Sequence, residues 1–100
     1  MLDRVKLALL ITEYDFDSEL LDSINAAFTD LGIAGVEGAT VNPDTTDGIV
    51  IRAVISYCGY MFEMMHGTID RSNAFKKSYD EQKAQLSMSN NYTNWSGVSV

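Results

Sequence analysis

Few side chains in this chain could do chemistry. There is one histidine and one cysteine. His66 follows Glu63 by one helical turn, so the two could form an acid–base pair, although a histidine at a helix end more often caps or packs. Cys58 lies inside a long apolar run, where a free thiol behaves as a small hydrophobic residue. These residues predict neither a nucleophilic site nor a zinc site.

Two further clusters resemble fragments of ligand sites. Asp15, Asp17 and Glu19 alternate like the start of a calcium loop, but the glycine and the distal glutamate of that loop are missing. The glycines within residues 32–38 are too loosely spaced for a phosphate-binding loop. We therefore expect the acids to mark a solvated helix start, and we expect no catalysis, no metal and no cofactor.

The most apolar stretch lies in the middle of the chain and predicts a buried helix over about residues 48–66. Its polar interruptions follow helical spacing and form one stripe, made of Arg52, Ser56, Gly59 and Glu63. The two charges inside the run argue against a membrane span. The small residues would allow another helix to approach closely, with the two charges pairing across a subunit interface. The alternative, that the stripe simply faces solvent, stays open.

Three more helices are expected around the central one. They cover about residues 2–10, 16–31 and 72–88. Asp70 or Ser72 would cap the last of them, which is polar with only a weak apolar line. Residues 32–47 are rich in glycine and small residues and predict a long loop. The predicted fold class is all-α, a small bundle of about four helices around the central buried helix.

A chain of 100 residues with 46 % hydrophobic residues and a single proline predicts one globular domain. We place a helical domain at residues 1–89 and an extended tail at residues 90–100. The tail is uncharged and carries Trp95 close to Tyr92, which favours anchoring on a partner surface over packing back on its own domain. The first residues lack the apolar core of a signal peptide, so synthesis in the cytoplasm is expected.

The net charge of −7 is unevenly placed. Residues 1–51 carry ten acids and two bases, whereas residues 52–100 carry four acids and five bases. Such an acidic chain binds nucleic-acid phosphates poorly. It suits a basic partner surface, or the wall of a channel through which DNA passes without being held.

Three stretches resemble the head–tail connector proteins of long-tailed bacteriophages, which are also called adaptor or head-completion proteins. The stretches are Val5–Ile11 with Phe16–Ala27, then Ile51–Tyr57, then Phe75–Ser89 followed by Tyr92 and Thr93. The third is the most specific, and the order and spacing agree with the family. The loop and the last residues lie outside the resemblance.

The resemblance implies a structural protein that assembles as a dodecameric ring below the portal protein. The ring would continue the DNA channel and seat the stopper or tail proteins at the head–tail junction of the virion, after synthesis in the host bacterial cytoplasm. Carried over by position, the portal-docking residues would be Phe75, Lys76, Lys77, Tyr79, Tyr92 and Trp95. The tail-side loop would present Val36, Glu37, Thr40 and Asn42.

A second hypothesis rests on the acidic first half of the chain. A monomeric or dimeric acidic binding protein could inhibit a DNA-binding protein by mimicking nucleic-acid charge. A mimic needs its acids in rows at phosphate-like spacing, whereas these acids sit mainly at helix starts. We therefore prefer the ring adaptor.

Overall fold

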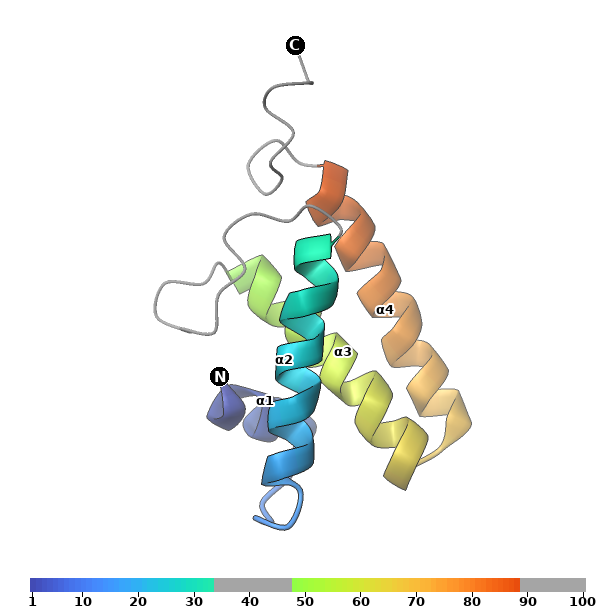
Figure 1. The fold of residues 1–100 in the computed structure, drawn as a ribbon. Helices are drawn as coiled ribbons and strands as arrows, with labels where there is room; N and C mark the ends of the chain where they lie inside the picture. Colours follow the sequence, from blue (N-terminus) through green and yellow to red (C-terminus); the bar gives the residue numbers. More distant parts are fainter. Residues whose placement is uncertain (34–47, 89–100) are drawn as a thin grey trace.

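The computed structural model describes residues 1–33 and 48–88, which form four α-helices (Figure 1). They are α1 (Leu2–Leu9), α2 (Asp17–Ile33), α3 (Gly48–His66) and α4 (Ile69–Met88). The described ranges contain no strand, so the all-α prediction is confirmed, and α3 has the bounds expected for the central helix. Residues 34–47 and 89–100, with most of the predicted loop and the whole predicted tail, lie outside the described residues, so those two elements stay predictions.

Helix α3 is the centre of the bundle. Helices α1, α2 and α4 all pack on it, with α2 in front, α1 behind α2 and α4 alongside in the view of Figure 1. Ten of the side chains that fill the core are Val5, Leu20, Ile24, Ala27, Leu31, Val50, Val54, Cys58, Tyr79 and Leu86. By length and composition α3 could cross a membrane, a test that the core helix of a soluble bundle also passes. Its cover by three helices accounts for its apolar sequence.

Helix α4 begins three residues earlier than predicted, because the cap is Thr68. The Thr68 hydroxyl accepts a hydrogen bond from the Arg71 backbone N–H at 3.3 Å, which satisfies a donor of the first turn. The Ser72 hydroxyl, one of the two predicted caps, instead donates to the Tyr60 carbonyl of α3 at 3.0 Å. The predicted cap at Asp70 or Ser72 was therefore wrong, and Ser72 joins two helices instead of starting one.

Helix α1 ends on an unusual residue. Leu10 occupies its C-cap in the left-handed conformation, with φ 59° and ψ 38°. Glycine is common at such helix ends because a side chain makes this conformation costly. The Leu10 side chain is 85 % exposed, so the core gains little from it.

Candidate interaction surfaces

The polar stripe of α3 lies largely against α4 of the same chain. Ser56 and Gly59 are both buried. A Cβ atom on Gly59 would lie 2.7 Å from a ring carbon of Phe75, closer than carbon atoms normally pack. The close helix approach that the sequence suggested therefore occurs within the chain. Phe75, which the resemblance placed at the portal, is half-buried in this contact.

The two charges of the stripe are kept apart. Glu63 forms an ion pair with Arg71 (Oε1 to Nε 3.3 Å) and accepts a hydrogen bond from the Thr68 N–H at 3.2 Å. It therefore braces the corner between α3 and α4. Arg52 is exposed near the start of α3, where it lines a hollow with Gln82 and Gln85. Of the four stripe residues, Arg52 is the one that faces solvent.

We expect Gly59→Ala to destabilise the bundle. The added methyl group would force the Phe75 ring to move, and overpacking of this kind costs about 1–3 kcal/mol, against about 1 kcal/mol gained from the better helix propensity of alanine. Urea unfolding should therefore show a net loss of up to about 2 kcal/mol in the free energy of unfolding. Gly48→Ala is the matched control, because a Cβ there meets nothing within 4 Å. If the two variants were equally stable, the tight α3–α4 packing would be refuted.

The portal-docking residues predicted on α4 divide into two pairs. Lys76 and Lys77 are exposed, and Lys76 forms an ion pair with Asp80 at 3.0 Å. Tyr79 is buried, and its ring packs edge-on against Tyr57 with 5.2 Å between the centroids. Helix α4 thus presents its lysines to solvent and its aromatic residues to α3. Tyr92 and Trp95, and the loop residues Val36, Glu37, Thr40 and Asn42, lie outside the described residues.

Tyr79 also ties α4 to α2. Its hydroxyl donates a hydrogen bond to Asp30 Oδ2 at 2.5 Å, and Lys83 Nζ lies 3.2 Å from the same oxygen. Burial and the Asp30 carboxylate raise the pKa of Tyr79. Partial burial acts to raise the pKa of Asp30, but hydrogen bonds from Tyr79 and Lys83 outweigh it and leave that pKa below its usual value. Nothing in the local sequence signals this contact, because its partners are 49 residues apart.

His66 pairs with an acid of a different helix. Its Nε2 lies 2.8 Å from Glu19 Oε2, and its ring packs between Phe16 and Phe62 with centroids 4.8 and 5.0 Å away. The packing that the sequence favoured for His66 is confirmed, and the less favoured pair with Glu63 is not formed. Asp17 at the same end of α2 also has a partner, Lys6 of α1, at 2.7 Å. The acids at the start of α2 thus fasten neighbouring helices, which is not the arrangement that a nucleic-acid mimic needs.

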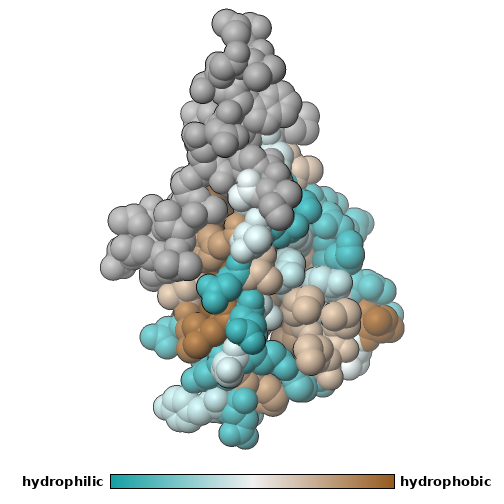
Figure 2. Space-filling view, viewed as in Figure 1, coloured by the Kyte–Doolittle hydropathy of each residue, from teal (hydrophilic) through white to brown (hydrophobic). Residues whose placement is uncertain are grey.

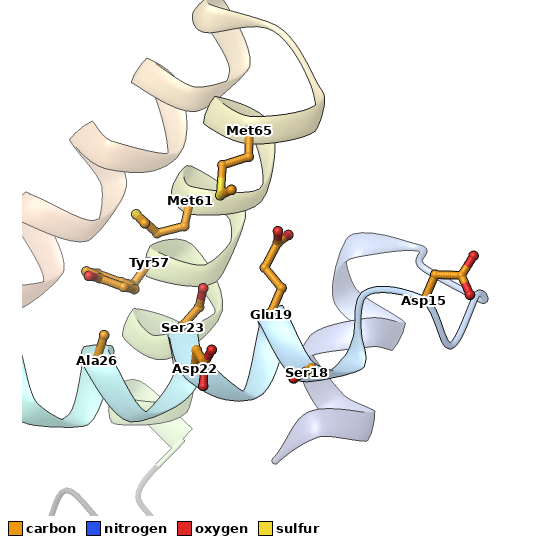
Figure 3. Close-up of a pocket in the computed structure, with 9 residues that line it drawn as sticks. All are labelled: Asp15, Ser18, Glu19, Asp22, Ser23, Ala26, Tyr57, Met61 and Met65. Atoms are coloured by element: carbon orange, nitrogen blue, oxygen red, sulfur yellow. The ribbon is translucent and has the colours of Figure 1, made fainter.

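An open groove of about 640 Å³ runs between α2 and α3 (Figure 3). Tyr57, Met61 and Met65 project into it from α3 at successive four-residue intervals. Helix α2 and the turn before it supply the other lining residues, which are Asp15, Ser18, Glu19, Asp22, Ser23 and Ala26. Figure 2 shows a hydrophobic area over the lower half of α3 bordered by hydrophilic side chains. We name this feature the α2–α3 groove. Met61 and Met65 belong to the apolar run that predicted a buried helix, so this groove was not predicted, although their spacing puts them on one face.

The described residues offer little for reaction chemistry. Within residues 1–33 and 48–88, no group of three or more His, Cys, Asp or Glu is placed to hold a metal ion. Burial raises the pKa of the Cys58 thiol to about 12, so the thiolate is not formed at neutral pH. What the described part of the chain does present is a set of exposed apolar, acidic and basic surfaces.

The described residues define the class of a small all-α helical bundle. The family model described as "Phage connector protein" matches residues 1–93, nearly the whole chain. The chain therefore belongs to the phage connector protein family, and the resemblance noted in its sequence is confirmed. Comparisons with curated proteins and with solved structures gave no significant match. Membership makes the protein a structural connector component of a phage virion, which contacts other virion proteins.

Proposed function

We propose that this connector protein is an adaptor that forms a dodecameric ring between the portal and the stopper or tail proteins and continues the DNA channel at the head–tail junction. The observation that carries the proposal is the family match over residues 1–93, which spans all four helices and extends beyond α4. The role needs no catalysis. It needs a rigid protomer with several separate contact surfaces, and a bundle braced between helices by ion pairs suits that need.

The portal contact is assigned to the outer face of α4 and to the tail. Lys76 and Lys77 are exposed there, and Phe75 and Tyr79 would act indirectly by fixing α4 on α3. Tyr92 and Trp95 complete the proposed portal side, and the loop residues Val36, Glu37, Thr40 and Asn42 form the proposed tail side. With a net charge of −7, a ring of such protomers would let DNA pass without trapping it.

The test is the mass of the purified protein, alone and mixed with its portal protein. Ring-sized particles, or recruitment onto the portal, are the expected result. Recruitment that persists after Lys77→Glu but is lost after Trp95→Ala would assign the contact to the tail instead of α4. A protein that stays monomeric and ignores the portal would overturn the adaptor role. Salt-resistant capture by a basic DNA-binding protein would then favour the acidic inhibitor.

Trp95→Ala is expected to leave the fold intact and weaken portal attachment. Trp95 lies outside every core stripe predicted from the sequence, and a tryptophan anchor commonly carries enough binding energy to change affinity by about tenfold or more. The thermal midpoint of the isolated protein and its affinity for the portal are the two measurements. Ser96→Ala, in the same tail, is the control for both. A large drop in the thermal midpoint would show that Trp95 belongs to the core.

A further inference from the structure

The most exposed large apolar side chains lie at the end of α1 and in the turn that follows it. Leu7 is 77 % exposed, Leu10 85 % and Tyr14 83 %, and these fractions exceed those of the other exposed large apolar residues in the described part of the chain. They lie within eight consecutive residues, and we name them the N-terminal patch. Burial of such side chains would be favourable, and the protomer does not gain this free energy while they remain in water. A patch of this kind is typical of a surface that another molecule covers.

Leu10 gives this patch a second, independent feature. Its left-handed backbone favours glycine, and its side chain reaches solvent instead of the core. A leucine there strains the monomer without a matching gain in packing. A contact with another molecule is therefore the best explanation for a leucine at this position.

The α2–α3 groove has the complementary character. Its α3 side is lined by Tyr57, Met61 and Met65, and methionine side chains adapt their shape to an apolar partner. Asp15 and Asp22 are exposed at its edge, and neither forms an ion pair with another residue that the structure describes. The groove therefore fits an apolar partner that carries a positive charge.

The N-terminal patch meets that description together with the neighbouring Arg4. Arg4 is exposed one helical turn before Leu7, on the same face of α1, and it too has no ion-pair partner within the described ranges. The nearby Asp3 lies in the first turn of α1, where the positive end of the helix dipole offsets its charge. The leucines of the patch thus suit the apolar wall of the groove, and Arg4 suits its acidic edge.

Leu10 of the N-terminal patch and the α3 wall of the groove lie on different sides of the protomer. Leu10 lines a small hollow with Gly59, Phe62 and Glu63 of α3, whereas the groove uses Tyr57, Met61 and Met65. At about 100° per residue the two sets of α3 positions point in roughly opposite directions. A contact that joins them between two copies is heterologous and leaves a free patch and a free groove at the ends. It therefore propagates, into a ring if the rotation between copies closes and into an open filament if it does not.

We propose that the N-terminal patch of one copy docks in the α2–α3 groove of the next copy. The inference rests on the proposed ring and names the contact that builds it. Arg4 lies against the acidic edge of the groove, and Leu7 and Leu10 lie on its methionines. This contact is separate from the α3 stripe, whose Gly59 already packs against Phe75 of α4.

Two variants at exposed positions test the contact from each side. Leu10→Gly removes the apolar side chain and relieves the left-handed strain, so the monomer should be at least as stable as wild type. Met65→Lys puts a charge in the groove at a residue that is exposed in the protomer. Each variant alone should weaken the affinity of self-association by about tenfold or more. The measurement is the mass of the particles in solution as a function of protein concentration. Ile69→Lys, at another exposed apolar residue outside both surfaces, should assemble like wild type.

Mixing the two variants is the decisive measurement. Leu10→Gly retains a working groove and Met65→Lys retains a working patch, so an equimolar mixture should form one-to-one dimers and nothing larger. Assembly of either variant like wild type, or a mixture that stays monomeric while wild type forms rings, would overturn the contact. A wild-type protein that is monomeric even at high concentration would also overturn it, whereas the adaptor role would still be judged by portal recruitment. Loss of portal binding in Met65→Lys without any self-association in wild type would assign the groove to the portal.

Discussion

Val54→Asp should unfold the protein at neutral pH. Val54 is fully buried in the middle of α3, among side chains of the common core. An ionised carboxylate there has no partner and no water, and an uncompensated buried charge costs about 3–5 kcal/mol or more. A domain of this size has a total stability of the same order. The far-ultraviolet circular dichroism of the purified variant should therefore lack the helical signal of wild type.

Arg52→Asp is the control for this substitution. It places the same side chain on the same helix two residues earlier, at an exposed position, so the helical signal should persist. Lowering the pH toward 4 should partly restore the Val54→Asp variant, because a neutral carboxyl is far less costly to bury than a charged one. A Val54→Asp protein that is folded and cooperative at pH 7 would show that α3 is not the centre of the core.

Tyr79→Ala should be the next most damaging change. It removes a buried ring that packs on Tyr57, together with the hydrogen bond to Asp30. Truncation of a buried aromatic residue typically costs about 3–5 kcal/mol, whereas Tyr79→Phe loses only the hydrogen bond, at about 1–3 kcal/mol. Denaturant unfolding of both variants separates packing from hydrogen bonding, with the exposed Lys77→Ala as control. Tyr79→Ala as stable as Lys77→Ala would place Tyr79 on a docking surface instead of in the core.

The hydrogen-bond part of this effect should depend on pH. The pKa of Asp30 is lowered in the folded protein, below its ordinary value of 3.8, so the ionised carboxylate stabilises the fold above about pH 4. That stabilisation is lost as the pH falls through the lowered pKa. The stability difference between wild type and Tyr79→Phe should therefore be largest near neutral pH and shrink below about pH 4. A difference that stays constant from pH 7 to pH 3 would show that the Asp30 carboxylate is not the acceptor.

The helices could be predicted from the sequence because their signals are local. Apolar periodicity located α3 with its bounds, and the same pattern located α2 to within two residues at its C-terminal end. The start of α4 was misplaced because three neighbouring polar residues could each cap it, and only the structure shows that Thr68 does. The spacing of residues in the sequence cannot tell which of several neighbouring polar residues caps a helix.

The surfaces were harder to predict because they depend on which helix covers which face. Ser56 and Gly59 correctly signalled a close helix approach, but the sequence could not say that α4 of the same chain makes it. Tyr79 was assigned to portal docking by the resemblance alone, and its bond to Asp30 could not be predicted because the two residues are far apart in the sequence. The α2–α3 groove exists only once two helices pack side by side, so no single segment could reveal it.

The corner between α3 and α4 has a consequence for the order of folding. The two helices are joined by Gly67 and Thr68 alone, and Glu63, Arg71 and Ser72 make their cross-contacts within a dozen residues of one another. Such short-range contacts cost little loop-closure entropy and form early, whereas the Tyr79–Asp30 bond must close a loop of 49 residues. We therefore expect the α3–α4 hairpin to form first and α2 to dock on it in a later step. The groove has one wall from α2 and the other from α3, so it forms only when α2 docks. A partly folded chain therefore cannot join an assembly that uses the groove.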